Sequence, residues 1–473
     1  MNGPIVRVFG TIVVLFAVLV VFTSRWTVFD AKSLNNNPLN HRTLIDELRI
    51  KRGRILANNG TVLAKSVPAP GGTWSRTYPT GSLFAQPVGY SIAAQGEAAG
   101  LELSRGSELR GLQTGLDSIF GQTTPNRVGD DVYTSLDPAA QRLAQQLLAG
   151  RKGSVVALNP RNGAVLAMYS NPTYDPNLVG HLPPGQSIFN RATQAGYPPG
   201  STFKVVTATA GIDSGRYTPD SAVNGDSPKI ISGVPLQNDG NQSWGLQPLT
   251  TALVNSINTI WAQVATSLGL STMTDYMKRF GFYSKPPIDL PPTELNASRP
   301  YSPSGRAYPP GSGNEDLGRI GIGQGGLLVT PLQMAMVAAA VANGGKLMAP
   351  HLATRAVDQT GRTVETVKPT VYGQVMKPST AAALTDMMRR VVEEGTGTAA
   401  NLSGVNVAGK TGTASVGATG SNLDNPWFIG FGPINDPKVA VAVTLENIPN
   451  GYGGTYAAPI AAQMIKLLES EGH

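Results

Sequence analysis

The chain contains no cysteine, only four histidines and few charged side chains. The absence of cysteine excludes disulfides, thiolate metal sites and cysteine nucleophiles. The histidines stand far apart, without the spacing of metal ligands, and we expect neither a metal nor another cofactor. Charged residues make up 14% of the chain, against about a quarter in an average protein. The net charge is +7, but no basic run is interleaved with aromatic residues, which argues against nucleic acid as a partner.

One long apolar run is present, near the N-terminus. Val8 to Ser24 carries no charge and is bracketed by Arg7 and Arg25. With the two apolar residues before it, the run spans about 20 residues, enough to cross a bilayer. A cleaved signal peptide is the alternative, but the run is longer than a usual signal core and no Ala-x-Ala site follows. We therefore expect a single-pass anchor in the cytoplasmic membrane, with the N-terminus inside and the rest of the chain outside.

The 473 residues have room for more than one domain, and the chain divides at changes of pattern. Residues 26–40 are typical of a linker, and residues 42–52 have a helical pattern. Residues 52–64 predict a hairpin with a tight turn at Asn59-Gly60. Pro138 to Leu148 predicts a helix with proline at its start. We predict a cytoplasmic tail and anchor over 1–25, a small α+β domain over 26–130, and a catalytic domain over 131–473.

Ser201 and Lys204 form the only Ser-x-x-Lys of the chain. On a helix the two residues share a face, so a neutral lysine amine can take the proton of the serine hydroxyl. The Pro198-Pro199-Gly200 that precedes them favours a helix starting at or near Ser201. A serine at a helix start faces unpaired backbone N–H groups, which stabilise an oxyanion. A surface serine that caps a helix is the alternative interpretation.

Two further motifs follow along the chain. Ser256-Ile257-Asn258 lies in an apolar, helix-like stretch, and Lys410-Thr411-Gly412-Thr413 contains the only Lys-Thr-Gly. Ser-x-Asn also occurs at Ser33 in the linker and at Ser312 in a segment rich in glycine and proline, where a turn is expected. The one at Ser256 is therefore preferred.

These three motifs in this order resemble those of the penicillin-recognising serine acyltransferases. The resemblance covers nearly the whole chain and is to class B penicillin-binding proteins, nearest to the actinobacterial penicillin-binding protein A type. It is carried by these further segments: 153–168, 171–177, 190–192, 323–325, 329–335, 395–399, 457–461 and, in the N-terminal part, 76–79. The resemblance implies an α/β transpeptidase domain of the penicillin-binding and serine β-lactamase type. Such a domain has an antiparallel sheet flanked by helices and an all-helical subdomain, here behind a membrane anchor and a small α+β pedestal.

The resemblance also implies a function. The chain is expected to be a peptidoglycan D,D-transpeptidase that cross-links stem peptides through an acyl-enzyme on Ser201, and to be acylated by β-lactams. Lys204 would be the general base, and the backbone N–H groups of Ser201 and Thr413 the oxyanion hole. Burial and the nearby Lys410 would disfavour the ammonium form of Lys204.

The remaining roles come from the same resemblance. Ser256 would relay a proton to the leaving D-alanine, and Asn258 would hold the substrate amide. Gly412 would let the substrate approach the strand. The terminal carboxylate of the substrate would be bound by Lys410, Thr411 and Thr413. A lipid-linked glycan polymerase and other wall-synthesis proteins are the implied partners, since no glycosyltransferase domain is evident.

Two other patterns compete with this interpretation. Residues 404–411 match the Walker A pattern, but the glycine-rich segment after Lys410 is unsuited to the helix that a P-loop requires. Glu294-Leu295-Asn296 resembles the motif of class A β-lactamases whose glutamate activates the deacylating water. A D,D-carboxypeptidase or β-lactamase using the same site, and a non-catalytic membrane-tethered scaffold, remain the alternatives.

Overall fold

The computed structural model describes residues 3–25, 47–112, 127–416 and 421–472. The first element is helix α1, Gly3–Ser24, which has 22 residues and no buried side chain. Its most apolar stretch of 18 residues has a mean hydropathy of 2.8, and among the described residues it is the one helix long and apolar enough to cross a membrane. The predicted anchor segment is therefore helical. The predicted linker and most of the helix predicted over 42–52 lie outside the described residues.

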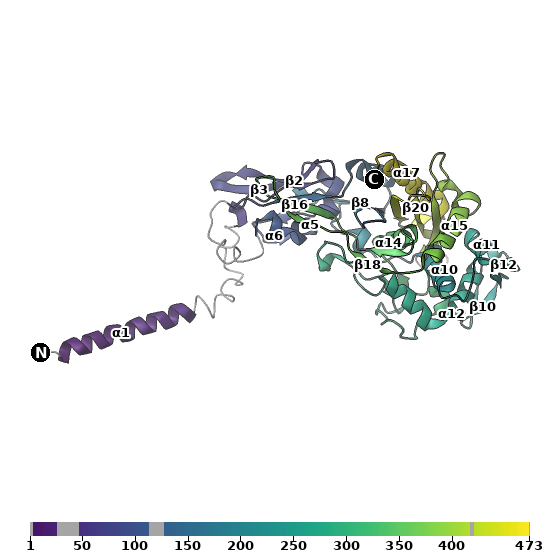
Figure 1. Cartoon of the computed structure of the whole chain (residues 1–473), viewed down its shortest axis with the longest axis horizontal. Coiled ribbons are helices and arrows are strands. Elements are labelled where there is room, and N and C mark those ends of the chain that lie inside the picture. The colour runs from purple at the N-terminus through teal and green to yellow at the C-terminus, as the bar shows by residue number, and fades with distance from the viewer. Residues whose placement is uncertain (1–2, 26–46, 113–126, 417–420, 473) are drawn as a thin grey trace.

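A six-stranded sheet lies at one end of the folded body, in the order β17-β16-β6-β1-β2-β3. The predicted hairpin is confirmed, because the first two strands of the chain pair antiparallel around a turn in which Gly60 has a φ of 82°. The strands of this sheet are β1 Ile55–Leu56, β2 Val62–Ala69, β3 Thr73–Thr77, β6 Asp131–Thr134, β16 Ala353–Val357 and β17 Thr363–Thr366. The sheet thus joins the N-terminal part of the chain to a segment far along the sequence (Figure 1).

Strands β6, β16 and β17 all belong to the range predicted for the catalytic domain, so this sheet crosses the predicted boundary at residues 130 and 131. That boundary stays a prediction. The N-terminal part also contains the short elements α4 Ala85–Val88, β4 Ser91–Ile92, β5 Glu97–Ala98, α5 Gly100–Ser104 and α6 Gly106–Leu109.

The second sheet is antiparallel and forms the centre of the catalytic part, in the order β19-β20-β21-β7-β8. Its strands are β7 Gly153–Leu158, β8 Val165–Asn171, β19 Ala408–Val416, β20 Leu423–Gly432 and β21 Val439–Leu445, with β22 Ile448–Pro449 added beside β20. The strand–turn–strand predicted over 153–168 is confirmed as β7 and β8. Strand β19, which carries Lys410 to Thr413, is one of the two edge strands of this sheet, the other being β8.

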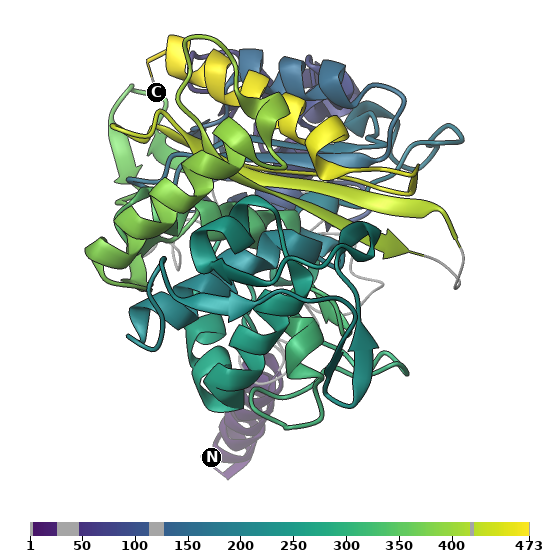
Figure 2. The same ribbon diagram turned by 90° about the vertical axis from the view of Figure 1, so that its right-hand side faces the viewer.

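Helices cover both faces of this sheet (Figure 2). Alternate strand residues point to opposite faces, so Val155 and Val441 pack with α8 Pro138–Leu148 and α17 Ala458–Ser470. Val156 and Ala442 pack on the other face with α14 Pro331–Ala342. Helix α8 has the bounds predicted from the sequence. The expected fold of a sheet flanked by helices is confirmed.

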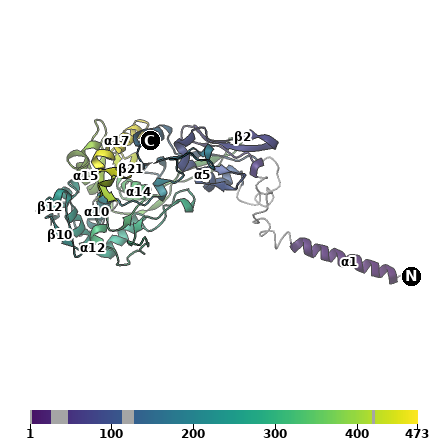
Figure 3. The same ribbon diagram turned by 180° about the vertical axis from the view of Figure 1, so that it is seen from behind.

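A helix-rich region lies beside the edge strand β19 (Figures 2 and 3). It contains α10 Lys204–Asp213, α11 Leu249–Val254, α12 Asn258–Arg279, α13 Leu317–Ile320 and α15 Pro378–Glu394. Two small antiparallel pairs add to the predicted helices: β9 Ala222–Asn224 with β12 Leu246–Pro248, and β10 Lys229–Ile231 with β11 Val234–Leu236. The other short elements are α9 Arg191–Gln194, β13 Arg299–Pro300, β14 Leu327–Leu328, β15 Lys346–Met348, β18 Val371–Gln374 and α16 Gly453–Tyr456.

Candidate active site

Ser201 lies in a 3-10 turn, η6 Gly200–Phe203, that leads directly into helix α10. The helix start expected near Ser201 is therefore confirmed. Gly200 makes the close approach possible, because its φ is 52° and a Cβ there would lie 2.5 Å from the Thr413 carbonyl oxygen. Its N–H donates to the Gly323 carbonyl at 3.0 Å. The Ser201 segment (residues 196–203) is thus pressed against the edge strand β19.

Lys204 is fully buried one turn after Ser201. Its Nζ lies 2.6 Å from the Ser256 carbonyl oxygen, 3.1 Å from Ser256 Oγ and 2.6 Å from Asn258 Oδ1. The sequence motifs around Ser201 and Ser256, far apart in the chain, therefore meet at one amine.

The local conformation at Ser256 differs from the prediction. Ser256 is not inside a helix but in the break between α11 and α12, with a φ of 56°. A positive φ is uncommon for a residue other than glycine. In this break both the carbonyl and the hydroxyl of Ser256 reach the Lys204 amine, which a serine within a continuous helix could not do, because its carbonyl would bond along the helix.

Lys410 is the second buried lysine, on strand β19. Its Nζ donates to the Thr411 carbonyl at 3.2 Å and lies 3.4 Å from Thr411 Oγ1. Thr411 Oγ1 is 2.6 Å from Thr396 Oγ1, and Thr413 Oγ1 accepts a hydrogen bond from Gly453 N–H at 3.2 Å. The strand therefore offers a cluster of hydroxyls beside a buried amine.

Both lysines have strongly lowered pKa values. Burial lowers the pKa of Lys204 well below its ordinary value of 10.5, the positive charge of Lys410 lowers it further, and Asp239 partly opposes this. Burial lowers the pKa of Lys410 to about 7. Within the described ranges neither lysine forms an ion pair with a carboxylate. The sequence predicts that burial and Lys410 disfavour the ammonium form of Lys204, and the pKa of Lys204 is lowered for these two reasons.

A cavity of about 850 Å³ opens over these groups. Six of the predicted site residues line it, while the two lysines lie behind its wall. The six are Ser201, Ser256, Asn258, Thr411, Gly412 and Thr413. Sequence reasoning assigned no role to several other lining residues, including Asp239, Thr396 and Gly453. Thr396 lies in the segment 395–399 that resembles the family, and this resemblance could have indicated its place in the site. Asp239 stands in no motif, so the sequence around it did not indicate a role.

The competing motifs lie elsewhere or have the wrong local structure. The Walker A interpretation is wrong, because residues 408–416 form a strand and no helix follows Lys410. Ser312 and Asn314 do not line the cavity over Ser201, and Ser33 is outside the described residues. Glu294 also lies away from it: its carboxylate accepts hydrogen bonds from Gly100 N–H, at 3.0 and 3.2 Å, at the start of α5.

Comparison with known proteins gives consistent matches along the chain. Residues 153–466 match the family model described as penicillin binding protein transpeptidase domain, and residues 52–127 match the penicillin binding protein A dimerisation domain. The chain is 34% identical to the peptidoglycan D,D-transpeptidase PbpA of Mycolicibacterium smegmatis, over 100% of both chains. It is 32% identical to the peptidoglycan D,D-transpeptidase MrdA of Acinetobacter baumannii, covering 82% of this chain and 65% of that protein.

Solved structures agree with these matches. The ceftriaxone acyl-enzyme of penicillin-binding protein A from M. tuberculosis superposes with a TM-score of 0.78 and 30% identity, covering 90% of this chain and 99% of that chain. A D,D-transpeptidase domain from Eggerthella lenta gives a TM-score of 0.75 and 32% identity, with the same coverage.

Proposed function

Because the chain belongs to the penicillin-binding protein transpeptidases, we infer that it is a peptidoglycan D,D-transpeptidase acting through an acyl-enzyme on Ser201. The single observation that carries this assignment is that all three motifs meet at one cavity. Lys204, one turn after Ser201, is buried there and its pKa is lowered. Wall stem peptides are its substrates. β-Lactams react in their place, as the acyl-enzyme structures of its relative illustrate.

The hydrogen bonds of Lys204 suit it to act as general base. A neutral amine has two hydrogens and one lone pair, and both hydrogens have an oxygen acceptor at 2.6 Å, in Ser256 and Asn258. The lone pair is then left to accept a hydroxyl proton. As Ser201 Oγ attacks the carbonyl between the two D-alanines, its proton passes to Lys204, and the negative charge on the carbonyl oxygen is stabilised by the N–H groups of Ser201 and Thr413.

Collapse of this intermediate breaks the bond to the terminal D-alanine. The leaving amine takes a proton from Ser256 Oγ, which lies 3.1 Å from Lys204 Nζ and is reprotonated by it. Asn258 holds the substrate amide, and Gly412 lets the peptide lie close to β19. The terminal carboxylate is bound by Lys410 in its ammonium form together with the hydroxyls of Thr411 and Thr413. An amine from a neighbouring stem peptide then displaces Ser201 and closes the cross-link.

The anchor and partners complete the proposal. Helix α1 holds the chain in the cytoplasmic membrane, with the N-terminus inside and the catalytic part outside. A separate lipid-linked glycan polymerase supplies the strands to be cross-linked, and this chain makes no glycosidic bonds itself. The proposal includes the predicted domains: an anchor over residues 1–25, a small domain over 26–130 and a catalytic domain over 131–473.

The test is intact-protein mass after incubation with ceftriaxone. The natural chain and a Ser312→Ala control, which removes the rejected motif serine, are expected to gain one covalent adduct, while Ser201→Ala gains none. An adduct that persists on Ser201→Ala would show that another group is the nucleophile.

The lifetime of that adduct separates the transpeptidase from a β-lactamase. Since Glu294 is bonded to the start of α5 and does not line the cavity, Glu294→Gln should leave the deacylation rate within about twofold of the natural chain. An adduct that lasts more than about tenfold longer in Glu294→Gln would mean that Glu294 activates water after all.

A further inference from the structure

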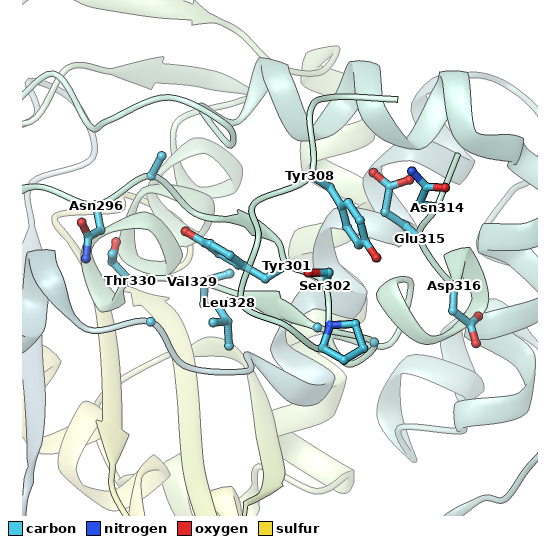
Figure 4. Close-up of a pocket in the computed structure, with 16 residues that line it drawn as sticks. Asn296, Tyr301, Ser302, Tyr308, Asn314, Glu315, Asp316, Leu328, Val329 and Thr330 are labelled. Carbon is cyan, nitrogen blue, oxygen red and sulfur yellow. The ribbon is translucent and has the colours of Figure 1, made fainter. Parts of the chain in front are cut away.

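A second cavity, of about 780 Å³, lies beside the catalytic one and shares no lining residue with it. Its walls come mainly from residues 296–316 and 325–330 (Figure 4). Gln324 lines the catalytic cavity, whereas the next two residues, Gly325 and Gly326, line the second one. The two cavities therefore lie on opposite sides of a single turn, residues 323–326.

This turn is in close contact with both sides. On the catalytic side, a Cβ on Gly323 would lie 2.0 Å from the Gly200 carbonyl oxygen. On the other side, a Cβ on Gly326 would lie 2.2 Å from the Tyr301 carbonyl oxygen, and Tyr301 N–H donates to Gly326 at 2.9 Å. The second cavity thus reaches the Ser201 segment directly, at Gly196 in its lining, and also contacts it across this turn.

Glu315 makes the second cavity chemically unusual. Both of its carboxylate oxygens are buried, and in the part of the chain that the structure describes neither has a hydrogen-bond partner. The adjacent Asp316 is different, because Arg319 lies 3.0 Å from its carboxylate. Burial, and then the negative charge of Glu315, raises the pKa of Tyr283 to about 12. A buried carboxylate without a partner is costly, so a cation that reached it would be bound favourably.

The rest of the lining fits an ammonium group on an apolar chain. Among the described residues that line the cavity there is no lysine, arginine or histidine. Two aromatic rings do line it, those of Tyr301 and Tyr308, and Figure 4 shows Tyr308 at the same end as Glu315. Tyrosine faces attract ammonium groups and pack well against alkyl chains. Asn296 and Ser302 add polar groups suited to peptide amides.

We propose that this cavity is a second binding site, which takes a primary ammonium group carried by a peptide, with the Glu315 carboxylate as the counter-ion. The rings of Tyr301 and Tyr308 contact the alkyl chain that bears the ammonium. This site is distinct from the catalytic cavity and does not depend on the role of Ser201.

The test is a calorimetric titration of the full-length Ser201→Ala chain in detergent with Nα-acetyl-lysine methylamide. The same compound acetylated on Nε, which has no charge, is the matched ligand control. The amine is expected to bind and the acetylated form not to bind. Glu315→Gln should weaken binding by about tenfold or more, and Tyr308→Leu by a few-fold. Equal binding of the acetylated compound, or unchanged affinity in Glu315→Gln, would overturn the proposal.

Two controls locate the amine and check the fold. Asp239→Asn removes an acid that lines the catalytic cavity, and it should leave the affinity unchanged. If Asp239→Asn rather than Glu315→Gln abolishes binding, the amine binds in the catalytic cavity and the proposal is wrong. Without ligand, Glu315→Gln should unfold at the same or a higher temperature, because it removes an unpartnered buried charge. A large fall would mean that Glu315 holds the fold together, and would equally overturn the proposal.

Discussion

Two regions of this protein bury charged side chains, and they do so in opposite ways. In the N-terminal part, the fully buried Glu102 lies between Arg52, at 3.0 Å, and Arg76, at 2.5 Å. In the catalytic part, Lys204 and Lys410 are also fully buried, but their neighbours are neutral oxygens and each other. The first arrangement neutralises its charge and the second does not.

The pKa directions follow from this difference. Burial alone would raise the pKa of Glu102, but Arg76 and Arg52 bring it below its ordinary value, so the carboxylate stays charged. For the two lysines burial acts against the charged form, and only Asp239 partly opposes it at Lys204, so both pKa values fall. A paired buried charge holds a structure together, whereas an unpaired one is available for proton transfer.

The largest expected effect follows from removing one of the two unpaired buried lysines, and it is on the rate of acylation. Lys204→Met removes the amine that accepts the proton of Ser201, so acylation by ceftriaxone should slow by about 10²- to 10⁴-fold. Lys278→Met, at an exposed position on α12, should acylate at the natural rate. The measurement is adduct mass against time, with circular dichroism to confirm the fold. An unchanged rate in Lys204→Met would remove this lysine from the mechanism.

The next largest effect follows from removing the paired buried carboxylate of Glu102, and it is on the free energy of unfolding. Glu102→Gln leaves two buried arginines without their carboxylate, which should cost about 3–5 kcal/mol. The exposed Glu97→Gln in the same part of the chain should cost less than about 0.5 kcal/mol. Urea unfolding measures both. As long as the Glu102→Gln chain is folded, its acylation rate should equal that of the natural chain; a slowed rate would show that this charge cluster also serves the catalytic site.

The smallest effect is on the pH dependence of stability, where the buried lysine and the buried glutamate act in different pH ranges. Lys410 has a pKa of about 7 when folded, against about 10.4 in an unfolded chain, so between these values the unfolded state binds more protons and stability rises with pH. For Glu102 the lowered pKa gives stability that is present above its ordinary value near 4.5 and is lost as the pH falls through the folded value.

Thermal unfolding between pH 3 and pH 10 tests both signs on the same protein. Lys410→Met should flatten the rise above pH 7, by up to about 1.4 kcal/mol per pH unit, and leave the acid limb unchanged. The exposed Lys466→Met is the control for loss of a lysine. Glu102→Gln should flatten only the acid limb. If Lys410→Met leaves the rise above pH 7 intact, the lysine is charged in the folded protein.

Local signals in the sequence predicted several individual elements, including two that lie away from the site. The Asn59-Gly60 turn predicted its hairpin, and the proline at the start of α8 predicted that helix, because turn and capping preferences act over a few residues. The fold class followed from the three motifs and the resemblance they carry. The roles of the site residues stay predictions, although the structure brings Ser201, Ser256 and Thr411 to one cavity.

Other features could not be predicted, because they depend on contacts between distant segments. The apolar pattern continues on both sides of Ser256, so nothing local indicated its positive φ or the break between α11 and α12. The hydrogen bonds of Glu294 to Gly100 join two parts of the fold and leave no trace in either local sequence. The unpartnered carboxylate of Glu315 likewise depends on which residues surround it in the folded chain.

The six-stranded sheet of the N-terminal part constrains both the order in which the chain can fold during synthesis and where it can be truncated. Strand β1 pairs in parallel with β6, and β6 pairs with β16, so the sheet is complete only after residues 353–366 have been synthesised. Until then β6 presents an unpaired edge, which is a site for wrong pairing. A recombinant fragment starting at residue 131 would contain β16 but lack β1, and would leave the opposite edge of β6 unpaired. The sheet of the N-terminal part is therefore completed by strands from the catalytic part.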